Sequence, residues 1–117
     1  MNNKKLQFDK HYEILDAIFN LVPFLFWKDK NGVYQGANFN QAKNLGFSSP
    51  LDFVGKTVFE FLKDQEAAAE IDKNDKEVMD TKTTRIIEER MIIEGEEKYY
   101  LSQKSPLFNP MGETVGM

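Results

Sequence analysis

Residues 24–38 read FLFWKDKNGVYQGAN and contain the strongest local structural signal in the sequence. Its first part, Phe24 to Lys28, is apolar and rich in aromatic residues, which is typical of a strand. Asp29 to Gly32 has the composition of a turn, and Val33 to Ala37 is the returning strand. The dipeptide Asn31-Gly32 is typical of a type I′ hairpin turn, because both central residues of that turn need a positive φ. The stretch therefore predicts a tight β-hairpin.

A short helix is expected directly after this hairpin. Asn38 is a good N-cap because its side-chain oxygen can accept a hydrogen bond from an early helical N–H. Gln41 stands three residues later, where its side chain can complete a capping box. Gly46 suits the position just beyond the last helical residue. The predicted helix spans Phe39 to Leu45.

Composition excludes several classes of protein. The chain has 117 residues, the size of one domain, and a formal net charge of −4, which argues against non-specific binding to nucleic acid. It has no cysteine, so disulfides, thiolate metal sites and cysteinyl–cofactor adducts are excluded. Since no apolar run is long enough to cross a bilayer, no membrane span is expected, and the composition fits a cytoplasmic protein.

The first twenty residues predict an amphipathic helix, roughly Asp9 to Leu21. Its apolar stripe is formed by Phe8, Tyr12, Leu15, Phe19 and Val22, widened by Ile14 and Ile18. Pro23 disfavours helical geometry at Val22 and ends the helix. Two compatible interpretations follow: the helix covers a sheet, or it also pairs with a second copy of the chain. The first is preferred.

A longer helix is predicted from Gln65 to Asp80, with Asp64 as its N-cap. Ala67, Ala68, Ile71, Asp75, Val78 and Met79 lie on or near one of its faces. Asp75 is the only charged member of that apolar face. An exposed carboxylate at the edge of the face is preferred to a functional one.

The last third of the chain predicts three strands. Thr83 to Glu94 is long and β-branched, Lys98 to Lys104 alternates, and Glu113 to Met117 begins a further strand after a turn at Asn109 to Gly112. We expect the run Glu88-Glu89-Arg90 to be an exposed strand face with cross-strand charge pairs. Strands separated by a block of helices predict an antiparallel α+β domain with the helices on one face.

This order of motifs resembles a PAS domain of the sensory-box type found in bacterial signal-transduction proteins. The likeness covers residues 21–117. The matching pieces are Leu21-Val22-Pro23, Phe26 to Gly32, Ala37-Asn38, Leu45-Gly46-Phe47, Val54 to Thr57, Asp75 with Val78, Lys104 to Leu107, Gly112 and Val115-Gly116.

The resemblance implies a five-stranded antiparallel sheet in the order 2-1-5-4-3, with short helices that enclose a pocket on one face. Residues 1–20 then form a cap or dimer contact, and residues 21–117 form the sensory domain. By analogy Phe24, Phe26 and Lys28 face the pocket, while Leu25 and Trp27 face the leading helix. In such a sheet the last strand is central, so a strand that stops at Met117 suggests a fragment of a longer protein. Truncating it is expected to lower stability or favour pairing with another chain.

Small-molecule pockets are mostly apolar with a few placed polar groups. The candidate ligand-binding residues are Phe26, Lys28, Phe39, Ala42, Phe59, Leu62, Ile71, Tyr100, Ser102 and Lys104. If Lys28 and Lys104 face one cavity, they favour an anionic ligand; the preferred alternative is that both extend to solvent at the strand ends. A pocket filled by aromatic side chains is an equal alternative to a bound ligand.

No cofactor is identified. The adduct of light-sensing relatives needs a cysteine, so it is excluded here. Haem-binding relatives commonly use a histidine in the pocket helices, whereas the single histidine, His11, lies in the leading helix and is expected at the surface. No carboxylate spacing suggests a metal site.

The resemblance implies a sensory module, with no catalytic residues, that binds a small ligand or a partner. It would relay to a C-terminal effector, such as a histidine kinase of a two-component system or a cyclic-dinucleotide enzyme, and would form a homodimer. The alternative is a dimerisation or protein-interaction module without a ligand. A small α+β enzyme with Asp29 or Asp75 as general base is least favoured, since no nucleophile–base pair is visible.

Overall fold

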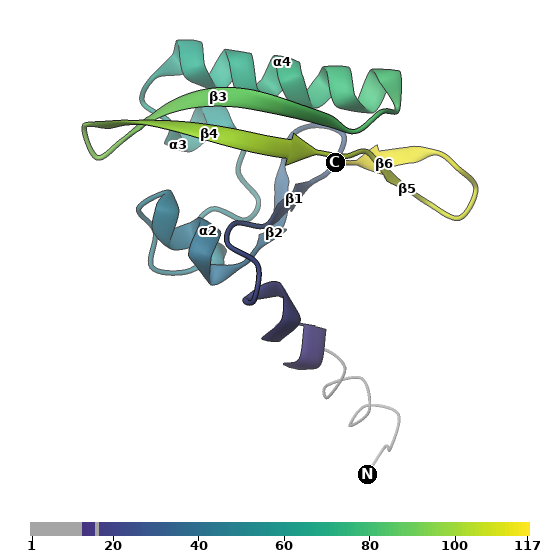
Figure 1. Ribbon diagram of the computed structural model, residues 1–117, viewed down its shortest axis with the longest axis horizontal. Helices are drawn as coiled ribbons and strands as arrows, with labels where there is room; N and C mark the ends of the chain where they lie inside the picture. The colour runs from purple at the N-terminus through teal and green to yellow at the C-terminus, as the bar shows by residue number, and fades with distance from the viewer. Residues whose placement is uncertain (1–12, 16) are drawn as a thin grey trace.

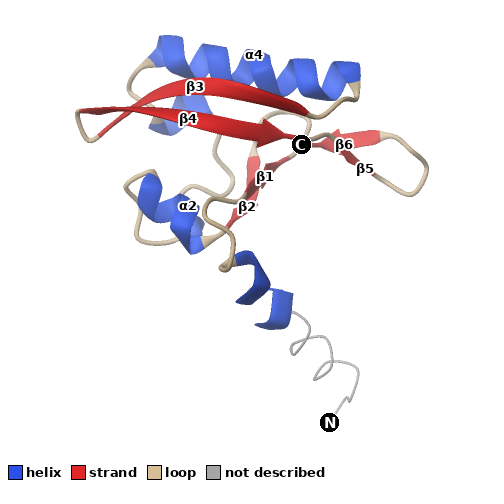
Figure 2. Ribbon diagram, viewed as in Figure 1, coloured by secondary structure: helices blue, strands red, loops and turns tan. Residues whose placement is uncertain are grey.

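A long helix covers one face of a curved antiparallel hairpin, and a second, smaller hairpin crosses below it (Figure 1). The computed structural model describes residues 13–15 and 17–117. The elements are β1 (Phe26–Lys28), β2 (Tyr34–Ala37), α2 (Phe39–Asn44), the 3₁₀ turn η1 (Pro50–Asp52), α3 (Val58–Phe61), α4 (Gln65–Thr81), β3 (Arg85–Ile93), β4 (Glu96–Lys104), β5 (Leu107–Phe108) and β6 (Thr114–Gly116). The predicted α+β class is confirmed (Figure 2). α4 and α2 contact the same face of β4, where Lys104 pairs with Asp75 and Tyr100 bonds to Asn44.

The turn between β1 and β2 is not of type I′. Gly32 has a φ of 81°, but Asn31 is not in the positive-φ region. Asp29 organises the turn instead: its Oδ1 accepts from the N–H groups of Asn31 (2.9 Å) and Val33 (3.0 Å). The Gly32 N–H also donates to the Asp29 carbonyl. The expected hairpin is present, with one left-handed residue rather than two.

A turn with the type I′ pattern joins β3 to β4. Glu94 and Gly95 have φ values of 52° and 78°, and Ile93 pairs directly with Glu96 across them. Two positive φ values match the twist of the paired strands, which is why two-residue hairpin loops adopt them. Glu94 and Gly95 thus form the turn, and Glu96 is already the first residue of β4.

The strands form three two-stranded antiparallel sheets rather than the one five-stranded sheet that the resemblance implied. β1 pairs with β2, β5 with β6, and β3 with β4, each antiparallel. β6 is joined to β1 by a bridge between Asp29 and Gly116, and the backbone groups of Lys28 and Met117 exchange hydrogen bonds of 2.9 and 3.0 Å. Pro106 lies in the break between β4 and β5, consistent with its missing N–H.

α4 begins at the predicted cap, where Asp64 Oδ1 accepts from the Ala67 N–H at 3.1 Å. The helix packs along β3 through the apolar face that was predicted (Figure 1). The buried core beneath it contains Tyr34, Ala42, Leu45, Phe53, Val58, Leu62, Ala68, Ile71, Met91 and Ile93. Aromatic contacts dominate its lower part, for example the ring of Tyr34 edge-on to that of Phe53 at 5.2 Å.

The segment before β1 is helical at residues 13–15 and 17–19. Asn38 attaches it to the domain, because its Nδ2 donates to the carbonyls of Phe19 (2.8 Å) and Val22 (2.9 Å). The ring of Trp27 lies 5.5 Å from that of Phe19, so Trp27 faces this helix as expected. The predicted residues Asp9 to Tyr12, including His11, lie outside the described residues. Within the described residues no helix is long and apolar enough to cross a bilayer.

Candidate ligand-binding site

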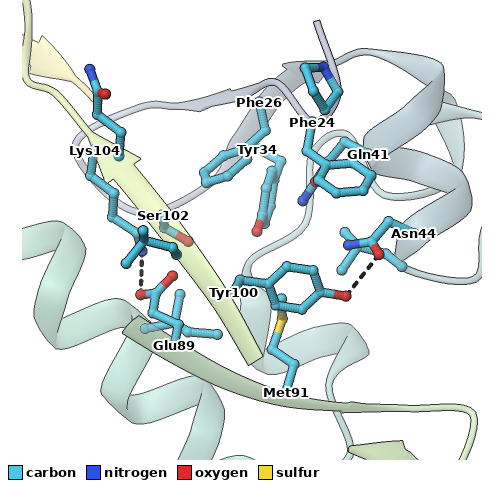
Figure 3. A pocket seen from close by; sticks show the side chains of 15 residues that line it. Phe24, Phe26, Tyr34, Gln41, Asn44, Glu89, Met91, Tyr100, Ser102 and Lys104 are labelled. Atoms are coloured by element: carbon cyan, nitrogen blue, oxygen red, sulfur yellow. Dashed lines mark hydrogen bonds and ion pairs between the residues drawn. The ribbon is translucent and has the colours of Figure 1, made fainter. Parts of the chain in front are cut away.

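A cavity of about 310 Å³ lies between the inner face of the β3–β4 hairpin and the layer formed by β1, β2 and α2. Figure 3 shows it from close by. It is lined by Pro23, Phe24, Phe26, Tyr34, Gln41, Asn44, Leu45, Ile71, Glu89, Met91, Tyr100, Leu101, Ser102, Gln103 and Lys104. Strand alternation explains which β4 residues point inward, because Tyr100, Ser102 and Lys104 share one face.

One end of the cavity is closed by a buried charge cluster, defined as Lys28, Asp75, Glu89 and Lys104. The Nζ of Lys28 lies 2.6 Å from Asp75 Oδ2, and the Nζ of Lys104 lies 2.6 Å from Asp75 Oδ1. Lys104 also pairs with Glu89 Oε2 at 2.5 Å, and Asn74 Nδ2 donates to the same oxygen at 3.2 Å. The cluster joins β1, α4, β3 and β4 through side chains that are at most 6% exposed.

Three expectations about exposure are wrong. Lys28 and Lys104 do not reach solvent, Asp75 is not at the edge of the α4 face, and Glu89 is not on the exposed face of β3. Each charge is buried beside an opposite charge, which offsets part of the desolvation cost. Two ammonium groups and two carboxylates cancel, so the cluster presents no net charge to the cavity.

The opposite end of the cavity is polar but uncharged. The Tyr100 hydroxyl donates to Asn44 Oδ1 at 2.8 Å, which links β4 to α2. The ring of Phe24 stands edge-on to that of Tyr100 at 6.3 Å and forms part of the wall.

Asn38 caps α2 as predicted, through a 2.9 Å bond from the Gln41 N–H. The Gln41 side chain does not complete the expected capping box and lines the cavity instead.

Two buried residues of the wall have a polar side chain with no hydrogen-bond partner within the described part of the chain. The two groups are the hydroxyl of Tyr34 and the amide of Gln41, and both residues are buried (4% and 5% exposed). Figure 3 shows the Tyr34 hydroxyl pointing into the cavity. Burial, with a further contribution from Asp75, raises the pKa of Tyr34, so its hydroxyl stays protonated and remains a donor.

The structure brings together half of the sequence-predicted site residues. Phe26, Ile71, Tyr100, Ser102 and Lys104 line the cavity. Lys28 lies behind it, in the charge cluster, with its Nζ 4.4 Å from the centre of the Tyr34 ring. Ala42 and Leu62 are buried in the core outside the cavity wall, and Phe39 and Phe59 are 44% and 40% exposed.

Sequence reasoning missed Tyr34, Gln41, Asn44, Glu89 and Met91 as site residues. For β3 a signal existed: Glu89, Met91 and Ile93 share one face of the strand, and all three are buried. Period-two alternation places Glu89 with the two apolar residues, but its charge led to the opposite assignment.

Within residues 13–15 and 17–117, no group of three or more His, Cys, Asp or Glu side chains could hold a metal ion.

Comparisons with known proteins agree on the fold. VqmA of Vibrio cholerae superimposes with a TM-score of 0.79 at 23% identity, over 90% of this chain and 47% of its own. The PAS domain of Bordetella pertussis BvgS gives 0.72 at 18% identity, over 92% and 81% of the two chains. A PAS domain from Colwellia psychrerythraea gives 0.73 at 18%, over 90% and 89%.

This chain thus spans about half the length of VqmA. No curated protein sequence matches it. The family model described as PAS fold matches residues 19–117, which is most of the chain and includes every strand, the helices from α2 to α4 and the cavity. The chain therefore belongs to the PAS fold family.

Proposed function

We propose that this chain is a sensory module that binds a small molecule in the cavity and relays occupancy to an effector domain. The observation that carries the proposal is the cavity itself, about 310 Å³ in volume, with an apolar wall and a few placed polar side chains. The similar protein VqmA has been solved bound to DPO and in a complex with ligand and DNA, which supports a ligand-binding role for this fold.

A route for the relay follows from the contacts of Lys28. Its side chain belongs to the charge cluster at one end of the cavity, and its backbone pairs with Met117 beside β6. A ligand that shifts the cluster would therefore act on the strand pairing next to the C-terminal end of the domain. The resemblance to sensory-box proteins supports a cytoplasmic effector of the histidine-kinase or cyclic-dinucleotide type. We infer a binding role rather than a catalytic one.

The test compares native and denaturing mass spectra of the purified protein, together with its ultraviolet–visible spectrum. We expect a non-covalent mass excess that disappears on denaturation. Ser102→Phe, which places a ring in the cavity, should abolish the excess. Glu96→Phe adds the same ring at an exposed position of the same strand and should retain it. A mass excess that survives Ser102→Phe would place the ligand outside the cavity.

A second candidate function is dimerisation without a ligand, and the helix before β1 favours it. Ile14 and Ile18 of the helix are 56% and 50% exposed, and Leu21 in the turn after it is 83% exposed, so this segment carries an uncovered apolar surface. Deletion of residues 1–20 should shift a dimer towards monomer in light scattering. An unchanged mass after that deletion would exclude the helix as the dimer contact.

A further inference from the structure

The charges around the cavity bear on what it can bind, provided that the proposed ligand-binding function holds. We propose that the cavity selects an uncharged, ring-containing ligand that accepts a hydrogen bond from the Tyr34 hydroxyl and pairs with the Gln41 amide. Three independent properties of the wall support this ligand class: its charge balance, its unpartnered polar groups and its shape.

The charge balance excludes ions. The charged side chains in the wall are Glu89 and Lys104, and they pair with each other at 2.5 Å. The Nζ of Lys104 also lies 2.6 Å from Oδ1 of Asp75, and the other oxygen of Asp75 pairs with Lys28. An anion or a cation entering the cavity would lose its hydration without gaining a free counter-charge, and that cost is large in an apolar site. This reverses the expectation that two lysines in one cavity favour an anionic ligand.

The unpartnered polar groups specify hydrogen bonds. The Tyr34 hydroxyl and the Gln41 amide line the cavity without a protein partner, so a ligand that pairs with them in place of water gains specificity. The protonated Tyr34 hydroxyl requires an acceptor on the ligand. The Gln41 amide offers both a donor and an acceptor, so a ligand with an amide-like edge can satisfy it.

The shape of the wall favours a ring. Phe26 and Tyr34 have ring centres 5.6 Å apart and line one side, and Phe24 and Tyr100 form an edge-on pair on another (Figure 3). Aromatic faces of this kind pack best against a planar, apolar group. A volume of about 310 Å³ accommodates one such ring with polar substituents.

Benzamide, benzoate and benzamidine test the inference. The three molecules have nearly the same shape, but the first is neutral, the second is an anion and the third is a cation. Binding to the full chain is measured by saturation-transfer NMR and by the shift in melting temperature. We expect benzamide to bind about tenfold more tightly than either ion, a factor that corresponds to the loss of one good polar interaction. Equal or tighter binding of benzoate or benzamidine overturns the inference and leaves the proposed function standing. If none of the three binds, the inference fails, and the mass excess of the purified protein still decides the proposed function separately.

Two variants make the test specific. Glu89→Gln leaves the charge cluster with one excess positive charge and should raise the affinity for benzoate relative to benzamide by about tenfold. Tyr34→Phe removes only the hydroxyl and should weaken benzamide about fivefold, while Tyr99→Phe, at an exposed position, should leave it unchanged. An unchanged benzoate-to-benzamide ratio in Glu89→Gln, or unchanged benzamide affinity in Tyr34→Phe, overturns the inference.

Discussion

The Nζ of Lys28 lies 2.6 Å from Oδ2 of Asp75, although the two residues are 47 positions apart in the sequence. Both side chains are 1% exposed. This ion pair links β1 to the middle of α4. The other carboxylate oxygen of Asp75 forms an ion pair with Lys104 of β4. One carboxylate therefore bridges two buried ammonium groups that come from different strands, and Glu89 supplies the second negative charge.

Replacing Asp75 by Asn should destabilise the domain by about 3–5 kcal/mol, because two buried lysines would then share only Glu89. Urea denaturation followed by circular dichroism measures the change. Asp72→Asn, on the same helix, breaks only a surface pair with Lys76, whose side chain is 58% exposed, and should cost less than about 1 kcal/mol. Equal effects of the two substitutions would contradict the role of the cluster.

Asn38→Ala should cost about 2–4 kcal/mol, since it removes the N-cap of α2 and the side-chain donor to the Phe19 carbonyl, while the Val22 carbonyl keeps its bond from Asn40. Asn38 is 2% exposed and bonds to Leu25, Gln41, Phe19 and Val22. Asn40→Ala is the matched control, because exposed Asn40 makes one side-chain bond, to the Val22 carbonyl. Chemical denaturation of both variants tests the difference; a cost below about 1 kcal/mol for Asn38→Ala would count against this prediction.

Gly36→Ala should displace the only tryptophan of the chain. A Cβ at position 36 would lie 2.1 Å from Cζ2 of Trp27, its partner across β1 and β2. We expect a loss of about 1–3 kcal/mol and a red-shifted tryptophan emission as the ring moves towards solvent. Gln35→Ala, at the adjacent exposed position, should leave the emission unchanged. A native-like spectrum for Gly36→Ala would show that the ring moves without losing its burial.

Tyr34 should make the domain sensitive to alkaline pH. Its pKa is raised above the ordinary value of 10.0, so the unfolded chain releases the hydroxyl proton at a lower pH than the folded chain does. The folded state then binds more protons, and stability falls as pH rises above about 10. Tyr34→Phe should reduce this loss in urea midpoints measured between about pH 9 and 11. An identical alkaline loss in wild type and Tyr34→Phe would assign the effect to other groups.

Much of the fold could be predicted because its signals are local. Asp64 and Asn38 cap their helices as expected, and the hairpins appear where turn residues separate apolar runs. The type of the first turn could not be assigned from Asn31-Gly32 alone. The Asp29 carboxylate bonds to the turn backbone and stabilises a different geometry.

The site was harder to predict because its polar part depends on pairing between distant segments. Hydropathy assigns lysine and glutamate to the surface, and only the meeting of β1, α4, β3 and β4 makes the burial of Lys28 and Glu89 tolerable. Phe39 and Phe59 were expected in an apolar pocket wall, but the sequence of a short helix does not show which way its aromatic side chains point.

Lys28 makes two kinds of attachment that are chemically separate. Its backbone N–H and carbonyl hold Met117, and these groups are the same in every amino acid except proline. Its ammonium group, by contrast, forms the ion pair with Asp75. Substitutions at position 28 therefore change the ion pair with Asp75 of α4, while the backbone hydrogen bonds to Met117 are kept. Position 28 is thus the place where mechanical coupling through the sheet and electrostatic coupling through the interior can be measured independently.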